Sequence, residues 1–218
     1  MRAKLVIFDF DGTLGDTRHN IVVTLQRTMR LRSLELRDEA TCAHTIGLTL
    51  EDSFLSMYPT MSREEARECV TTYRDIFYQS IEELTPALFP HVKETLQMLH
   101  NEDIAMSIAS SRSSPSLHLF LRNMGIADYF PYVLGSDSVE RHKPDPEPVL
   151  KTLRDMGYDA SEAIVVGDMP VDIAMAHNAG VRAIGVSYGN ATHEELIAAN
   201  ADAVIDHISE LIDAIEGL

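Results

Sequence analysis

Two carboxylates at the end of the first apolar run are spaced for holding a cation. Asp9 and Asp11 directly follow the run Leu5–Phe8, which is typical of a buried parallel strand. Side chains two positions apart in a strand point the same way, so the carboxylates repel each other unless a cation or a proton lies between them. An Asx-type turn would explain an isolated Asp-x-Asp-Gly equally well, so the interpretation depends on the other strand ends.

More polar groups follow later apolar runs at the same kind of position. They are Ser110, Ser111, Lys143, Asp168 and Asp172. Taken singly, each has an ordinary explanation, such as a helix cap or a solvated surface charge. Their repeated occurrence at strand ends favours one shared site. Carboxylates gathered in this way need a hard divalent cation, and an oxygen-rich site that also takes a phosphate suits Mg²⁺.

The elements that must position these groups alternate between helix and strand. After residue 90 the strand patterns are separated by helical ones, and the expected strands are 104–109, 132–134, 163–166, 182–186 and 203–205. This alternation predicts an α/β fold, a Rossmann-like doubly wound parallel sheet with helices on both faces. In such a sheet, ligands bind beyond the carboxyl ends of the strands, where the strand order reverses. The polar groups above are therefore expected to meet there.

Residues 16–84 differ because no strand pattern interrupts them. Apolar residues recur at helical spacing over 21–29 and again near 50–58. A capping box at Ser62–Glu65 begins a further helix, which we expect to end near Leu84. The sequence thus predicts an all-helical cap domain, 16–84, inserted into an α/β core domain made of 1–15 and 85–218.

The overall charge limits the classes of partner. The chain has 34 acidic and 18 basic residues among 218, a formal net charge of −16. Such a field repels nucleic acids and anionic membranes, so we expect neither as a partner. No apolar run approaches the length that spans a bilayer, and the first strand begins too early for a signal peptide, which indicates a cytoplasmic protein.

Together these motifs resemble a known family. The segment 9–14 (DFDGTL), Ser110, Lys143-Pro144 and Gly167-Asp168-x-x-x-Asp172 are similar to the four signature motifs of the haloacid dehalogenase superfamily. The resemblance covers essentially the whole chain and is nearest to the phosphoglycolate phosphatase-like subfamily with a small helical cap. The sequence departs from many relatives at 110–112, where Ser-Ser-Arg replaces Thr-Asn-Lys, and at Met169-Pro170.

The resemblance implies a magnesium-dependent phosphatase that acts on a small phosphate monoester, with 2-phosphoglycolate as the candidate substrate. We expect a monomer or a homodimer. The resemblance also implies that Asp9 is the nucleophile and Asp11 the general acid and base. The Asp9 and Asp168 carboxylates and the Asp11 backbone carbonyl would hold Mg²⁺. Asp172 would lie behind them and orient a metal-bound water or the lysine. The phosphoryl group would be bound by Ser110, Ser111 and Lys143.

Two alternatives stay open at this point. A phosphotransferase of the β-phosphoglucomutase type would share the same core motifs, and a non-catalytic phosphate-binding module would be expected to lack Asp9. Substrate selection is expected in the helical segment, where residues 45–49 could be a substrate loop or a plain helix connection. Four arginines of that segment could meet a substrate carboxylate or could simply be solvated: Arg18, Arg27, Arg30 and Arg32.

Overall fold

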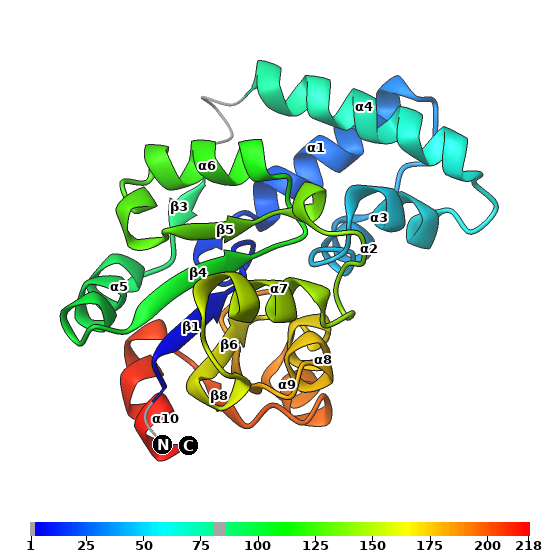
Figure 1. Ribbon diagram of the computed structural model, residues 1–218. Coiled ribbons are helices and arrows are strands. Elements are labelled where there is room, and N and C mark those ends of the chain that lie inside the picture. The colour runs from blue at the N-terminus through cyan, green and yellow to red at the C-terminus, as the bar shows by residue number, and fades with distance from the viewer. Residues whose placement is uncertain (1–2, 81–85) are drawn as a thin grey trace.

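A six-stranded parallel sheet forms the centre of the molecule (Figure 1). The computed structural model describes residues 3–80 and 86–218. The strands are β1 (Leu5–Phe8), β4 (Ala105–Ala109), β5 (Tyr132–Leu134), β6 (Ala163–Gly167), β7 (Arg182–Val186) and β8 (Ala203–Ile205). Their order is β5-β4-β1-β6-β7-β8, and every pairing is parallel. The predicted α/β fold with a parallel sheet is confirmed.

The strand order reverses at β1. This strand pairs with β4 on one side, where Phe8 lies opposite Ile108, and with β6 on the other, where Phe8 lies opposite Val166. The chain fills one half of the sheet before it crosses to the other. The segments that follow β1, β4 and β6 therefore emerge next to one another, which is where an α/β sheet binds its ligand.

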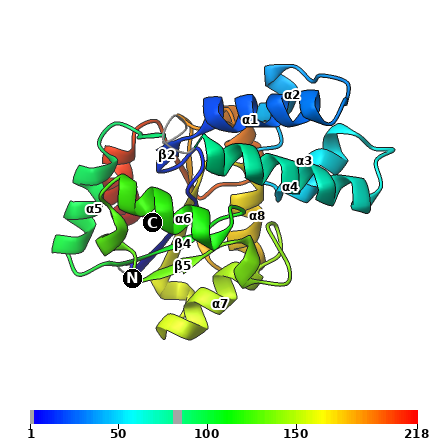
Figure 2. The same cartoon turned by 90° about the horizontal axis from the view of Figure 1, so that it is seen from above.

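Helices cover both faces of the sheet (Figure 2). One face carries α5 (Val92–Asn101), α6 (Ser114–Asn123) and α10 (Leu211–Gly217), and the other carries α7 (Glu147–Met156), α8 (Pro170–Asn178) and α9 (His193–Ala198). Short 3-10 helices are η1 (Ala127–Tyr129), η2 (Ser136–Ser138), η3 (Ala160–Glu162) and η4 (Ile208–Glu210). In β1, Val6 and Phe8 belong to the first core, whereas Leu5 and Ile7 belong to the second. This burial on both faces explains why the strand is an unbroken apolar run.

The helical segment contains α1 (Arg18–Leu31), α2 (Glu39–Ala43), α3 (Leu50–Met57) and α4 (Arg63–Gln79). It lies beyond the carboxyl end of β1 in Figure 1, and α4 packs against both α1 and α3. The predicted capping box is present, since the Ser62 hydroxyl accepts a hydrogen bond from the Glu65 N–H. The expected end of this helix near Leu84 lies outside the described residues. The short helix α2 was not predicted.

Two short strands join the helical segment to the sheet. These are β2 (Gly15–Asp16) and β3 (Ala87–Leu88), which pair antiparallel so that the outgoing and returning chains run side by side. A two-residue strand has no periodicity, so neither strand could be predicted from the sequence. A Cβ at Gly15 would lie 3.3 Å from the ring of Phe10, which gives a packing reason for the glycine there.

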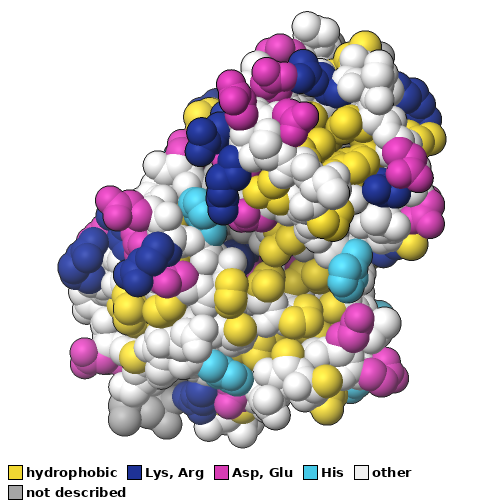
Figure 3. All heavy atoms as spheres, turned by 90° about the vertical axis from the view of Figure 1, so that its right-hand side faces the viewer, with side chains coloured by type: hydrophobic (Ala, Val, Ile, Leu, Met, Phe, Trp, Pro, Cys, Tyr) yellow, Lys and Arg dark blue, Asp and Glu magenta, His cyan; other side chains and the backbone are white. Residues whose placement is uncertain are grey.

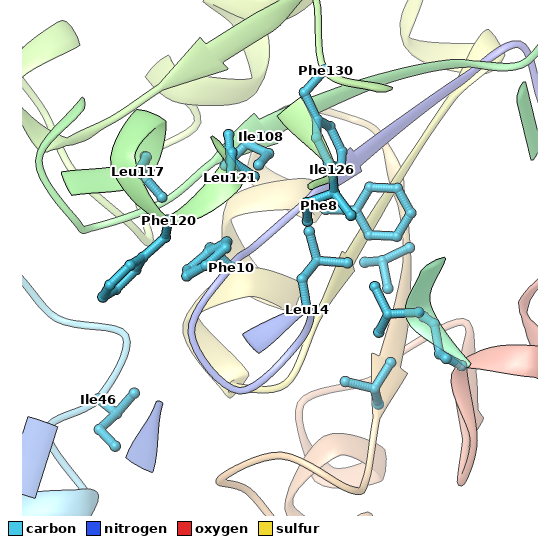
Figure 4. Close-up of a cluster of buried hydrophobic side chains, with 14 of the residues drawn as sticks. Phe8, Phe10, Leu14, Ile46, Ile108, Leu117, Phe120, Leu121, Ile126 and Phe130 are labelled. Atoms are coloured by element: carbon cyan, nitrogen blue, oxygen red, sulfur yellow. The ribbon is translucent and has the colours of Figure 1, made fainter. Parts of the chain in front are cut away.

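Aromatic rings connect the segment after β1 to α6 and α4, and Figure 4 shows Phe10 and Phe120 side by side. Phe10 stacks on Phe120 of α6 with ring centroids 5.9 Å apart, and Phe77 of α4 meets the same ring edge-on at 5.5 Å. All three side chains are buried. Pairs of this kind stabilise packing beyond the area that they bury, by about 0.5–1.5 kcal/mol each.

Candidate active site

Three buried carboxylates from distant parts of the chain meet at the strand ends. Asp9 follows β1 and is 2% exposed, whereas Asp168 follows β6 and Asp172 lies in the first turn of α8, both fully buried. One carboxylate oxygen of each lies within 4.8 Å of the others. The structure thus brings these three residues together at the carboxyl ends of the strands, as the sequence analysis expected.

Lys143 lies among these carboxylates. Its ammonium group donates to Asp172 Oδ1 at 2.6 Å and lies 2.8 Å from Asp9 Oδ1. The other Asp172 oxygen accepts from the Met169 N–H at 3.0 Å, so both oxygens of Asp172 are occupied within the protein. Asp172 therefore holds the lysine in place. Burial lowers the pKa of Lys143, but the Asp172 and Asp9 carboxylates outweigh it and raise the pKa overall, which keeps the lysine charged.

Burial also shapes the two carboxylates that follow the strands. It raises the pKa of Asp9 to about 7, an effect opposed by Lys143 and increased by Asp172 and Asp11. Burial likewise raises the pKa of Asp168, and the neighbouring Asp172 and Asp9 carboxylates raise it further. Ionised carboxylates at this density are unfavourable unless positive charge neutralises them.

The donor set fits a hard divalent cation. Asp9 Oδ1 is buried beside the Lys143 ammonium group, 2.8 Å away, and no further hydrogen-bond donor among the described residues binds it. The three side chains of the cluster offer only carboxylate oxygens, the ligands that Mg²⁺ prefers. Three buried carboxylates with a single ammonium group between them therefore fit a divalent cation.

Asn190 was missed by the sequence analysis. Its backbone N–H and its side-chain Nδ2 both donate to Asp168 Oδ2, each at 2.8 Å, while Thr13 Oγ1 lies 3.3 Å from the other oxygen. These contacts orient the Asp168 carboxylate. A signal existed, because Gly189-Asn190 comes shortly after the strand 182–186, but an uncharged amide in a loop did not stand out.

Two glycines let the backbone approach Asp168 closely. Gly12 has a φ of +84°, and a Cβ there would lie 2.1 Å from Asp168 Oδ2. A Cβ at Gly189 would lie 2.4 Å from the Asp168 Cβ and 2.5 Å from the Gly12 carbonyl oxygen. Only glycine fits at either position without displacing the carboxylate.

The Asp11 side chain lies apart from the carboxylate cluster and pairs with Arg112. Both Asp11 oxygens accept from Arg112 Nε, at 3.2 and 3.1 Å, and Oδ1 also accepts from Nη2 at 2.6 Å. Burial lowers the pKa of Arg112, but the Asp11 carboxylate raises it by more. The sequence analysis noted Arg112 only as part of a departure from the family pattern and did not foresee its partner.

A cavity of about 430 Å³ lies between the strand ends and the helical segment. Asp9, Asp11 and Ser110 line it on the sheet side, and the opposite wall combines apolar side chains such as Leu25 and Tyr73 with polar and charged ones. Figure 3 shows hydrophobic side chains gathered in the hollow between the upper and lower parts of the molecule. A cavity with both polar and apolar walls suits a small ligand that carries a polar head.

The arginines of this cavity are not those expected. None of Arg18, Arg27, Arg30 and Arg32 lines it. Three of these four bind exposed partners elsewhere, namely Glu39, Ser80 and Glu68. The arginines that do line the cavity are Arg67, Arg74 and Arg112.

The two serines after β4 have different contacts. Ser110 is 8% exposed, and its hydroxyl accepts from the Arg112 N–H at 3.3 Å. The Ser111 hydroxyl instead donates to the Gly47 carbonyl at 2.6 Å, so this side chain connects the core to the helical segment. Residues 45–49 connect α2 to α3 and also line the cavity, so a role as a substrate loop stays a prediction.

Comparisons with known proteins give a consistent result. The family model for haloacid dehalogenase-like hydrolases matches residues 6–186. The chain is 36% identical over 216 residues to the probable phosphatase IndB of Dickeya dadantii, covering 98% of this chain and 94% of the relative. It is 33% identical over 223 residues to the phosphoglycolate phosphatase of Vibrio vulnificus, covering 97% and 96%.

Solved structures share the fold. A hydrolase from Pseudomonas syringae superimposes with a TM-score of 0.87 at 21% identity, covering 100% of this chain and 99% of the other. A haloacid dehalogenase-like family hydrolase from Streptococcus pneumoniae does so with a TM-score of 0.85 at 21% identity, covering 97% and 98%. Among residues 3–80 and 86–218, no helix has the length and apolarity to cross a membrane.

Proposed function

This chain belongs to the haloacid dehalogenase-like hydrolases, and on that premise we propose that it is a magnesium-dependent phosphatase of a small phosphate monoester. Several of its relatives carry the name phosphoglycolate phosphatase, which makes 2-phosphoglycolate the first substrate to test. The observation that carries the proposal is the position of Asp9. It is buried beside Lys143 and the Asp168 carboxylate, and it opens onto the cavity.

In the first step, an Asp9 carboxylate oxygen attacks phosphorus and forms an aspartyl-phosphate, while the bond between phosphorus and the ester oxygen breaks. Asp11 must carry a proton for this step, on Oδ2, while Oδ1 still accepts from Arg112 Nη2. It gives that proton to the departing oxygen, which leaves as an alcohol. Ser110, the Ser111 backbone N–H and Lys143 bind the phosphoryl oxygens and stabilise the charge that gathers on them in the transition state.

In the second step, water attacks the phosphorus of the aspartyl-phosphate. Asp11 takes a proton from that water, the bond between Asp9 and phosphorus breaks, and inorganic phosphate is released with the Asp9 carboxylate restored. Splitting the hydrolysis in this way replaces one very slow reaction with two easier ones. Phosphate monoesters are among the slowest substrates known, with enzymatic accelerations of up to roughly 10²¹.

The proposed metal site consists of the Asp9 and Asp168 carboxylates and the Asp11 backbone carbonyl. Bound Mg²⁺ would neutralise the carboxylates and the phosphoryl oxygens. Asp172 keeps Lys143 directed at Asp9, and Asn190 keeps the Asp168 carboxylate turned toward the site. These positions do not depend on the metal, because they are fixed by contacts within the protein.

We further propose that α1–α4 act as a cap domain, 16–84, over a core domain of 1–15 and 85–218. The adjacent strands β2 and β3 would be its hinge. A cytoplasmic monomer or homodimer acting on a phosphorylated metabolite is the working form.

The proposal is tested with purified protein, Mg²⁺ and a panel of phosphate esters that includes 2-phosphoglycolate, β-glucose 1-phosphate and p-nitrophenyl phosphate. We expect phosphate release that requires Mg²⁺ and is lost by at least about 10³-fold in Asp9→Asn, with an unchanged far-UV circular dichroism spectrum. Substantial turnover by Asp9→Asn would exclude Asp9 as the nucleophile. Formation of glucose 6-phosphate instead of free phosphate would indicate a phosphotransferase.

A further inference from the structure

Arg112 is an arginine built into the wall of the cavity. Its side chain is 9% exposed, and its guanidinium carbon lies 4.8 Å from the Phe120 ring centroid and 5.6 Å from that of Phe77. Nη1 donates to Ser116 Oγ at 3.0 Å. A guanidinium held on its faces and edges is pre-organised, so it loses little freedom when it binds an anion.

The guanidinium has more donors than its protein contacts use. Of its five N–H groups, Nε–H and one on Nη2 point to Asp11, and one on Nη1 points to Ser116. Among the described residues, one N–H on each terminal nitrogen has no recorded acceptor. Each of these remaining donors can form a charge-assisted hydrogen bond to an anion such as a carboxylate.

The position of Arg112 follows from its contact with Asp11. In the proposed reaction, the Asp11 carboxyl must reach the ester oxygen that leaves. Arg112 Nη2 is only 2.6 Å from Asp11 Oδ1, so the guanidinium lies one hydrogen bond beyond that oxygen. A substituent on the carbon that bears the ester oxygen would therefore come close to Arg112.

The other arginines of the cavity are placed differently. Arg67 lies 3.4 Å from Glu51, and its side chain is 68% exposed. Arg74 is on the exposed side of α4. Solvent and salt screen exposed charges, whereas a buried guanidinium binds an anion more strongly.

We propose that Arg112 is a specificity-determining residue that binds a carboxylate on the carbon next to the phosphate ester oxygen. This inference rests on the proposed function and assigns its substrate class. The class is the 2-phospho carboxylic acids, of which 2-phosphoglycolate is the smallest. One edge of the guanidinium holds Asp11, and its free donors hold the substrate acid. Neutral esters of the same size leave those donors unused and bind more weakly.

The test compares two inert phosphonates by titration calorimetry with Mg²⁺ present, so that no turnover is needed. In 3-phosphonopropionate a methylene replaces the ester oxygen of 2-phosphoglycolate, and in propylphosphonate a methyl group also replaces the carboxylate. We expect the wild-type protein to bind the first at least about tenfold more tightly, since a charge-assisted pair contributes this much. Arg112→Met should reduce the ratio of the two dissociation constants to about one, and Arg74→Met, the matched control, should leave it unchanged.

Arg112→Lys is a second variant that retains a positive charge next to Asp11, in case Arg112→Met does not fold. Thermal unfolding of each variant verifies the fold. Lysine lacks the planar fork, so the ratio should fall to an intermediate value. Equal binding of both phosphonates by the wild type overturns the inference and leaves the phosphatase proposal intact, as does a ratio preserved in Arg112→Met. A ratio lost only in Arg74→Met would assign the carboxylate to the helical segment. If neither phosphonate binds the wild type, the proposed phosphoryl-binding site, and with it the proposed function, is contradicted.

Discussion

Asp168 owes its orientation to neighbours that carry no charge. The side-chain amide of Asn190 donates to one of its oxygens, and two glycines allow the backbone to close around it. Groups that orient a metal ligand commonly change metal affinity by about 10–100-fold when they are removed.

Asn190→Ala should therefore weaken Mg²⁺ binding by about tenfold, because the backbone N–H of the same residue keeps one of the two hydrogen bonds. The Mg²⁺ concentration for half-maximal phosphatase activity measures this change. Asn123→Ala, an exposed substitution at the end of α6, is the control and should not alter it. An unchanged Mg²⁺ requirement in Asn190→Ala would mean that Asp168 does not bind the metal.

Gly189→Ala tests the close approach of the backbone. The added methyl group meets the Asp168 Cβ and the Gly12 carbonyl, so we expect a loss of about 1–3 kcal/mol in the free energy of unfolding together with loss of Mg²⁺ binding. Denaturant unfolding measures the first and calorimetry the second. Gly217→Ala, whose Cβ would meet no atom within 4 Å, should change neither.

The charged residues of the site were predictable because they directly follow apolar strands. Asp9 and Asp168 could be placed together from the order of strands and helices alone. The partner of Arg112 could not, because Asp11 lies 101 positions away and the pairing depends on how side chains fold back over the sheet edge. Asn190 escaped for a different reason, since nothing in its type distinguishes it from an ordinary loop amide.

At the scale of elements, the prediction succeeded where a helix or strand carries its own boundary signal. The capping box at Ser62 begins α4 as predicted, and β5, β7 and β8 have the predicted bounds. The five-residue α2 and the two-residue β2 and β3 have too few residues for any period to appear. Their positions are set by tertiary packing, so only the folded structure reveals these three elements.

The contact between Ser111 and Gly47 is the hydrogen bond through which the core holds the segment 45–49. Ser111→Ala removes it but keeps the backbone N–H proposed for phosphate binding. A neutral hydrogen bond contributes about 1 kcal/mol, so we expect KM to rise up to about fivefold with kcat nearly unchanged. Steady-state kinetics on the best substrate measures both constants.

Ser113→Ala is the matched control, because Ser113 also lines the cavity but its side chain makes no capping hydrogen bond. It should leave KM unchanged. A fall in kcat of a hundredfold or so in Ser111→Ala would instead indicate that the hydroxyl acts on the phosphoryl group.

At the scale of the whole molecule, the acidic net charge opposes the binding of an anion. A net charge of −16 repels a phosphate ester at a distance, and the site counters this locally with Lys143, Arg112 and the proposed metal. The buried carboxylates that would hold the metal must then be a source of instability in its absence. This connects the chemistry of the site with the stability of the fold.

The connection predicts how stability depends on pH. In the folded, metal-free protein, burial raises the pKa of Asp9 to about 7 from its ordinary value of 3.8. Protonated Asp9 therefore stabilises the fold fully below about pH 4, and this contribution is lost as the pH rises through about 7. In EDTA, the melting temperature of Asp9→Asn minus that of the wild type should accordingly increase by several degrees from acid to neutral pH. Taking the difference cancels the effect of the many surface carboxylates that titrate alike in both proteins.

Saturating Mg²⁺ should shrink or reverse this difference in melting temperature at neutral pH, because the ionised Asp9 carboxylate then has a cation to bind. A difference that is independent of both pH and Mg²⁺ would mean that Asp9 is ionised without cost in the empty site and does not contact the metal.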